Sequence, residues 1–320
     1  MLKWCAQLSC AHHFSINVQR MGDKYLSDDV KQGLVKKQMW TEAELAQVDE
    51  LLEACNAYEG LCVKLAMATL RARSGHEIND FLYYVEGKLV GLLALDNMGT
   101  EEKEVTVVVH PDYRRRGIAT ALLAAAREEA QRRGIERFIL VCERFSRSGQ
   151  AFVAALGAEY DHSEHKMVLA ELHTRQDYSE QITLRKASPA DVKIVAHIIA
   201  ACFGQTEEGA RRHVAESVHD PYNQYYVAEL AGEAVGCLNL FMDDREYGIY
   251  AFGILPQYRR RGFGGQMLEQ IIVDIRSNSQ SAQKRIALEV ENENKHAIHL
   301  YRSRGFQEIT TYGYYNFDLV

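Results

Sequence analysis

An arginine-rich heptapeptide that occurs twice carries the clearest chemistry in this sequence. Pro-Asp-Tyr-Arg-Arg-Arg-Gly occupies 111–117, and Pro-Gln-Tyr-Arg-Arg-Arg-Gly occupies 256–262. Each follows an apolar β-rich run and precedes residues with helical periodicity. A helix N-terminus offers unpaired backbone N–H groups and a positive dipole end, and guanidinium groups add charged donors. Each of these Arg-Gly turns therefore predicts an anion site, most naturally for phosphates.

Small residues support this interpretation. Gly117 and Gly262 can adopt positive φ or let a ligand approach the backbone, and Ala119 and Gly264 keep the following surface small. The alternative is that the arginines form a solvated surface. Because the motif recurs between a strand and a helix in both repeats, the anion site is favoured. Sites for ATP or NAD are not supported. The chain lacks Gly-x-x-x-x-Gly-Lys-Ser/Thr, and Met267 stands where a dinucleotide fingerprint needs a small residue.

The duplication extends beyond the turns. The two heptapeptides are 145 residues apart, and Gly-Lys-Leu-Val-Gly at 87–91 parallels Gly-Glu-Ala-Val-Gly at 232–236 at the same offset. Strands are predicted at 81–85, 89–95, 105–109 and 137–142, and again at 225–230, 234–241, 249–255 and 285–290. In each repeat a helix follows the Arg-Gly turn, a second helix ends near Gly157 or Gly305, and a β-rich tail closes the repeat. The predicted class is mixed α/β, with two tandem copies of one fold.

The two repeats begin differently. In the second, a strand at 182–187 precedes a helix from about Pro189, with Ser188 as its N-cap. The first opens with a helical stretch at about 27–73 and shows no clear first strand. The charged segment 171–180 reads as the linker.

We therefore expect the first repeat at 21–173 and the second at 174–320, preceded by a frayed, disordered N-terminal extension at 1–20. Met21 is an alternative start of the native protein. The extension contains Cys5, Cys10, His12 and His13, whose spacing matches no zinc pattern, so no metal site is predicted.

Composition excludes several classes of protein. Of 320 residues, 47% are hydrophobic and 25% charged, which is typical of a globular protein, and the net charge of −7 gives no support for nucleic-acid binding. The sequence has no apolar run of 18 residues and no secretory signal pattern, so neither membrane insertion nor secretion is expected. Seven dispersed cysteines fit reduced thiols in a cytoplasmic protein.

The repeated motif resembles a known family. Arg-x-x-Gly-x-Gly/Ala, at 114–119 and 259–264, is similar to the acetyl-CoA pyrophosphate loop of the GNAT acyltransferase superfamily. The second repeat adds Asn294-x-x-Ala-x-x-Leu-Tyr301-x-x-x-Gly305-Phe, which resembles a second cofactor motif of that family. The layout is similar to two-domain members such as the mycothiol synthases. The resemblance covers about 174–320 and 75–170, and residues 1–74 match poorly.

This resemblance implies acetyl-CoA as the cofactor and names the residues around it. In the second repeat these are Ile254, Leu255, Arg259, Arg260, Arg261, Gly262, Phe263, Gly264, Gly265 and Asn294; in the first they are Val109, Arg114, Arg115, Arg116, Gly117, Ile118 and Ala119. An N-cap role for Asn294 is an equally physical alternative.

The resemblance also implies that Tyr301 donates a proton to the coenzyme A thiolate, although a tyrosine here also suits packing. Aligning the repeats on Gly157 and Gly305 puts Val153 in place of Tyr301 and Ser146 in place of Asn294. The second repeat should therefore be catalytic. The first is expected to be a degenerate or regulatory acyl-CoA domain, or a scaffold for the substrate pocket.

The general base is less well defined. Glu246 is the carboxylate nearest the third strand of the second repeat, and Glu104 resembles a family base position but lies in the first repeat. For both glutamates, we expect an exposed surface charge without a catalytic role rather than a base. A water relay or an acceptor amine that is already neutral can replace a general base. Gly253 suits a strand bulge that exposes backbone N–H groups to the thioester, as the family requires.

The predicted activity is transfer of an acetyl group from acetyl-CoA to a primary amine by direct attack. The acceptor would be a small molecule or a peptide. The alternative is an acyl-CoA sensor without catalysis. Tyrosines at 222, 225, 226, 312, 314 and 315 can line an acceptor pocket or simply pack across a sheet face, and they define no substrate.

Overall fold

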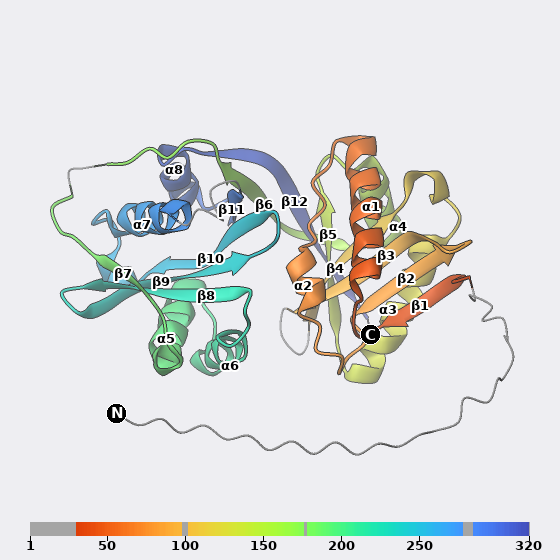
Figure 1. Cartoon of the computed structure of the whole chain (residues 1–320), viewed down its shortest axis with the longest axis horizontal. Helices are drawn as coiled ribbons and strands as arrows, with labels where there is room; N and C mark the ends of the chain where they lie inside the picture. Colours follow the sequence, from red (N-terminus) through yellow and green to blue (C-terminus); the bar gives the residue numbers. More distant parts are fainter. Residues whose placement is uncertain (1–29, 98–101, 176–177, 278–283, 320) are drawn as a thin grey trace, which may run out of the picture. The chain divides into compact units, whose positions relative to one another are not determined.

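One mixed sheet of twelve strands runs through both repeats in the computed structural model, which describes residues 30–97, 102–175, 178–277 and 284–319 (Figure 1). The predicted extension at 1–20 and the alternative start at Met21 lie outside the described residues. Residues Lys31–Val320 form one compact unit. The mixed α/β class predicted from the repeat is confirmed.

The first repeat contributes six strands and four helices among the described residues. Their bounds are β1 (Gly33–Lys37), α1 (Glu42–Glu59), α2 (Met67–Arg71), β2 (Asp80–Val85), β3 (Lys88–Asn97), β4 (Glu102–Val109), α3 (Ile118–Arg133), β5 (Arg137–Glu143), α4 (Arg147–Leu156) and β6 (Glu159–Leu169). Helices α1 and α2 pack on one face of the sheet, and α3 and α4 on the other (Figure 1).

The second repeat follows the same plan. Its elements are β7 (Thr183–Lys186), α5 (Val192–Phe203), α6 (Glu207–Ser217), β8 (Asn223–Leu230), β9 (Glu233–Met242), β10 (Glu246–Ile254), α7 (Phe263–Ser277), β11 (Arg285–Glu291), α8 (Lys295–Ser303) and β12 (Phe306–Asp318). Helices α7 and α8 cover one face of the sheet, and α5 and α6 cover the other (Figure 1).

The predicted opening of the first repeat is wrong. A strand, β1, lies within the stretch expected to be helical, and the helix α1 ends at Glu59. Gly33 and Gly60 adopt φ of 75° and 69°, which an uninterrupted helix does not permit. Thr41 starts α1 through a capping box with Glu44. In the second repeat, Ser188 forms the expected cap, although a 3₁₀ turn precedes α5.

The repeats exchange their last strands. The strand order is β1-β2-β3-β4-β5-β12-β6-β11-β10-β9-β8-β7. Strand β12 of the second repeat pairs with β5 of the first, while β6 of the first pairs with β11 of the second. The two exchanged strands also pair with each other. Each half of the sheet is thus completed by a strand from the other repeat.

This exchange predicts that neither repeat folds as a monomer by itself. Fragments 31–173 and 174–320, expressed separately, should each leave a long strand edge unpaired and associate or aggregate. Co-expressed, they should purify together. Size exclusion and thermal unfolding measure this, and a monomeric fragment that unfolds cooperatively would contradict it.

Candidate functional site

The two Arg-Gly turns have nearly the same backbone. After β4 and β10 the chain makes a short 3₁₀ turn, Pro111–Tyr113 or Pro256–Tyr258. The second arginine of each triplet is left-handed, with φ of 62° in the first repeat and 65° in the second. The closing glycines have φ of 78° and 84°. Each turn therefore connects the end of a strand to the N-terminus of a helix, as the motif predicts.

The first arginine of each triplet closes its turn. Arg114 Nε donates to the carbonyl of Val109 at 3.1 Å, and Arg259 Nε donates to that of Ile254 at 2.9 Å. These bonds use part of each guanidinium to hold the strand end to the turn. The local contact explains why arginine suits this position in both repeats even before a ligand is considered.

The other arginines differ in their availability. Arg261 is bound to the carboxylate of Glu180 at 2.6 and 2.9 Å, and Arg116 Nη2 donates to the carbonyl of Asp112 at 2.9 Å. Arg115 and Arg260 are exposed and have no ion-pair partner among the described residues. The middle arginine of each triplet is thus the one most available to an anion.

Helix α7 begins on a surface of small residues. A Cβ atom added to Gly264 would lie 3.3 Å from Cδ2 of Leu300 on α8, so a larger residue would fill the space between α7 and α8. A Cβ atom added to Gly265 would clash with the Arg304 guanidinium and lie 3.1 Å from the Tyr178 hydroxyl. Tyr178 precedes β7 in a segment without helical or strand periodicity, so no sequence pattern predicts its position beside α7.

Not every predicted cofactor residue presents its side chain. Phe263, Leu255 and Ile118 are buried in hydrophobic clusters, and Val109 and Ile254 pack against such clusters. What these positions can offer a ligand is backbone N–H and C=O groups. Ala119 is half-buried on the first turn of α3, next to Gly117, the residue that caps that helix.

A bulge distorts β10 at the position predicted for it. The β9–β10 pairing shifts register between Tyr250 and Gly253, and Ala251 has a φ of 46°, which is strained for a residue with a side chain. In the first repeat, β3 and β4 pair without a shift from Gly91 to Asn97. The bulge is therefore a feature of the second repeat.

Strands β10 and β11 diverge just where the bulge begins. Their parallel pairing ends at Ile249 and Leu288, so the following backbone groups are not used between these two strands. Tyr301 of α8 lies over the diverging part of β10, because its ring packs edge-on against Phe252 with centroids 5.9 Å apart. Burial alone raises the pKa of Tyr301, with no hydrogen bond from the described residues to its hydroxyl.

In the first repeat, the residues aligned with Tyr301 and Asn294 have structural roles. Val153 is buried where the second repeat has Tyr301. Ser146 caps α4 through a bond from Gly149 N, and Asn294 caps α8 through a bond of 3.1 Å from Ala297 N. The alternative role considered for Asn294 is thus present in the structure. The cap occupies its Oδ1, and the exposed side chain retains its amide donor.

In the first repeat a carboxylate lies beside the turn. Glu59, the last residue of α1, accepts a bond from Arg114 Nη1 at 2.8 Å and another from Ser148 Oγ of α4 at 3.2 Å. The Arg114 guanidinium and the Ser148 bond lower the pKa of Glu59 against the effect of burial. A negative charge is therefore held between the Arg-Gly turn and α4, where it would repel a phosphate.

The two glutamates considered as bases are not surface charges. Glu246 is the first residue of β10, and its side chain is 18% exposed. It accepts a bond from Lys166 at 2.6 Å and pairs with Arg285 at 3.4 Å, at the end of β10 remote from the bulge. The Glu104 side chain is 14% exposed and lies 3.4 Å from Lys64 Nζ, and burial raises the pKa of Glu104.

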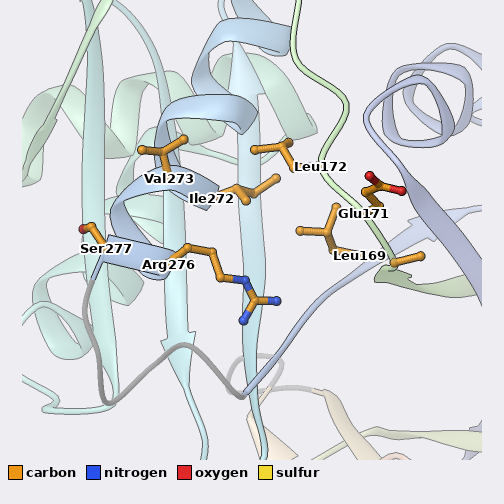
Figure 2. Close-up of a pocket in the computed structure, with 8 residues that line it drawn as sticks. Leu169, Glu171, Leu172, Ile272, Val273, Arg276 and Ser277 are labelled. Atoms are coloured by element: carbon orange, nitrogen blue, oxygen red, sulfur yellow. The ribbon is translucent and has the colours of Figure 1, made fainter.

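A pocket of about 390 Å³ lies between the end of β6, in the first repeat, and α7 of the second (Figure 2). It is lined by Leu169, Ala170, Glu171, Leu172, Ile272, Val273, Arg276 and Ser277. These residues include the last turns of α7, whereas the Arg-Gly turn precedes its first turn. At 1.5 Å per residue the two ends of this helix are roughly 20 Å apart. The pocket is separate from the predicted site.

The part of the chain that the structure describes contains no candidate metal site and no candidate membrane-spanning helix. No group of three or more His, Cys, Asp or Glu residues there is arranged to hold a metal ion, and no helix is long and apolar enough to cross a membrane. The five described cysteines are free thiols. The metal-capable residues at 5–13 lie outside the described range.

The bulge predicts a steric test. A Cβ atom added at Gly253 would lie 2.8 Å from Sγ of Cys202 on α5. Gly253→Ala should lower the free energy of unfolding by about 1–3 kcal/mol. The double variant with Cys202→Ala should recover part of that loss, with Cys202→Ala alone as the control. Urea unfolding measures the effect. Full stability of Gly253→Ala would contradict the described packing.

Comparisons with known proteins agree with this geometry. The sequence matches the acetyltransferase (GNAT) family at residues 45–158 and again at 192–306. It is 27% identical over 286 residues to mycothiol acetyltransferase of Thermomonospora curvata, covering 83% of this chain and 91% of that protein.

Two solved structures share the fold along most of the chain. A GCN5-related N-acetyltransferase from Sphaerobacter thermophilus has a TM-score of 0.71 at 19% identity, covering 89% of this chain and 96% of that one. A tandem GNAT protein from the clavulanic acid biosynthesis pathway has a TM-score of 0.67 at 15% identity, covering 90% and 98%. Because the family match falls once in each repeat and spans more than half of the sequence, this chain belongs to the acetyltransferase (GNAT) family of enzymes.

Proposed function

We propose that the second repeat transfers an acetyl group from acetyl-CoA to a primary amine by direct attack. The observation that carries this proposal is the combination, in that repeat, of the strained bulge in β10, its divergence from β11 and Tyr301 lying over the gap. The first repeat has neither the bulge nor the tyrosine. The cytoplasm is the proposed location, and the acceptor is a small molecule or a peptide.

Acetyl-CoA fits the residues at the start of α7. The first N–H groups of a helix lack intrahelical partners, and Arg260 adds an exposed guanidinium beside them, so the pyrophosphate would be held by backbone and charge together. Gly262 supplies the left-handed residue of the turn, Gly264 and Gly265 let α7 pack closely against Leu300, Arg304 and Tyr178, and Arg259 closes the turn. The exposed amide of Asn294 would contact the cofactor from the start of α8.

Tyr301 is proposed as the proton donor to the thiolate that leaves. Burial raises its pKa, so the phenol keeps its proton at neutral pH. A hydroxyl without a partner is also free to turn toward the sulfur. Glu246, the base predicted from the sequence, is held by ion pairs with Lys166 and Arg285 in the part of β10 that is still paired with β11.

The first repeat is proposed as a scaffold. Its Arg-Gly turn, Arg114 to Ala119, keeps the backbone of an anion site, but the carboxylate of Glu59 lies against Arg114. We propose the repeat boundary near residues 173 and 174, in the segment between β6 and β7. The exchanged strands β6 and β12 would then make the first repeat part of the support for the catalytic one.

Tyr301→Phe tests the assignment. Thiol release from acetyl-CoA in the presence of a panel of primary amines should fall by about 10²-fold or more, because the departing thiolate loses its proton donor. Binding of acetyl-CoA should not change, because the ring is retained. Tyr226→Phe is the matched control, since it removes another buried hydroxyl, which is bonded to Asp274. Turnover at the wild-type rate in Tyr301→Phe would contradict the proposal, and a chain that binds acetyl-CoA without any turnover would favour a sensor.

A further inference from the structure

A row of polar side chains crosses the sheet at the level where β10 and β11 diverge. Asn239 of β9 is the ladder partner of Tyr250 on β10, and Lys166 of β6 is the ladder partner of Glu289 on β11. Tyr250 and Glu289 each directly follow the last paired residue of their strands. Because those last paired residues pack under α7, Tyr250 and Glu289 lie on the opposite face of the sheet. Tyr301 and Glu289 thus stand on opposite faces of the same gap.

One member of this row is a buried acceptor without a donor. Asn239 is 7% exposed, and its Nδ2 donates to Oδ1 of Asn223 at 2.7 Å. Its own Oδ1 is buried and has no hydrogen-bond partner among the described residues. Leaving a buried acceptor unpaired destabilises the folded chain. A ligand that brings an N–H donor to this point would remove that cost.

The charges around Glu289 are unbalanced. Its carboxylate lies 2.9 Å from Nζ of Lys64, which reaches it from the loop before α2 in the first repeat. The same ammonium lies 3.4 Å from Glu104 and donates to the Tyr314 hydroxyl at 2.5 Å, which in turn donates to Glu164 at 2.6 Å. The Lys64 ammonium therefore contacts two carboxylates directly and a third through a tyrosine hydroxyl, while the neighbouring Lys166 ammonium is bonded to Glu246. In a partly buried setting this excess of carboxylates favours a second cation.

We propose that Glu289, Tyr250 and Asn239 receive the acceptor as an aliphatic primary ammonium ion, and that Glu289 accepts its proton. This inference rests on the proposed function, because it names the acceptor class and the base of the same site. Tyr250 is 39% exposed, so an amine can reach the row from solvent. The Glu289 side chain is only 9% exposed, so the carboxylate acts where water is scarce.

These groups account for every proton that is transferred in the reaction. The ammonium gives one proton to Glu289, which later releases it to solvent. The freed nitrogen lone pair forms the C–N bond to the thioester carbonyl carbon, and the C–S bond breaks with its electron pair on sulfur. The sulfur takes the Tyr301 proton. The second proton lost by nitrogen as the amide forms restores the phenol.

The double variant removes Lys64 together with the Glu289 carboxylate, so that no ammonium is left without its ion-pair partner. Glu289→Gln alone would leave Lys64 short of its nearest carboxylate, so the double variant Glu289→Gln with Lys64→Met is compared with it. Glu291→Gln is the control, because Glu291 is an exposed glutamate two residues further along the same strand. The acceptor probe is n-butylammonium chloride, and tetramethylammonium chloride, which has no N–H donor, is the matched salt.

Two measurements are made on the full chain. Thiol release from acetyl-CoA with n-butylammonium should fall by about 10²- to 10⁴-fold in both Glu289 variants and stay at the wild-type rate in Glu291→Gln. Without acetyl-CoA, n-butylammonium but not tetramethylammonium should raise the melting temperature of the wild type, and the double variant should lose that shift.

Failure of the inference is distinct from failure of the proposed function. Undiminished transfer in the Glu289 variants, or the same melting shift in wild type and double variant, would overturn the assignment of this row. A wild-type chain that neither binds acetyl-CoA nor releases thiol would instead overturn the proposed function. The melting measurement still decides the ammonium site in that case.

Discussion

The divergence of β10 from β11 is the constraint on which the account depends. Pairing of β10 with β11 ends at Ile249, just before the extra residue of β10, whereas β4 and β5 of the first repeat also stop pairing, at Val105, but without a bulge. The backbone groups beyond this point can then serve a ligand instead of a neighbouring strand. The strain at Ala251 and the close packing of Gly253 on Cys202 show that surrounding structure holds the bulge in place.

The exchanged strands give the first repeat a role that does not require it to bind a cofactor. Strands β6 and β12 pair along most of their lengths at the centre of the sheet. Lys166 of β6 and Lys64 of the loop before α2 both bring positive charge to the carboxylates of the second repeat. Conversely, the Tyr312 hydroxyl of β12, in the second repeat, donates to the Cys62 carbonyl of the first repeat at 2.7 Å. Each repeat thus positions part of the other.

Local sequence pattern predicted most strands and the helices that follow the turns. The Arg-Gly turn was readable because Pro, Arg and Gly each restrict or relax the backbone within seven residues. The first strand of the first repeat was missed because Gly-Leu-Val-Lys-Lys at 33–37 is short and lies beside a capped helix. Helix α6 was also missed, although Thr206 followed by two glutamates is a helix start signal.

Long-range features could not be predicted in the same way. Strand exchange leaves the alternation of each strand unchanged, so β6 and β12 look the same whichever partner they choose. The meeting of Glu289 with Lys64 joins residues 225 positions apart and depends on that exchange. Glu246 was favoured as a base because it lies near the strand in sequence. Its place four residues before the divergence and its pairing with Arg285 follow only from the register of β10 and β11.

We propose that only the second repeat binds acetyl-CoA. Calorimetric titration of the full chain with acetyl-CoA tests it most directly, because the stoichiometry does not depend on knowing the acceptor. We expect one site per chain, in the repeat with the bulge and the exposed Arg260. Two sites of similar affinity would contradict it, since the Glu59 carboxylate would then fail to exclude the cofactor from the first repeat.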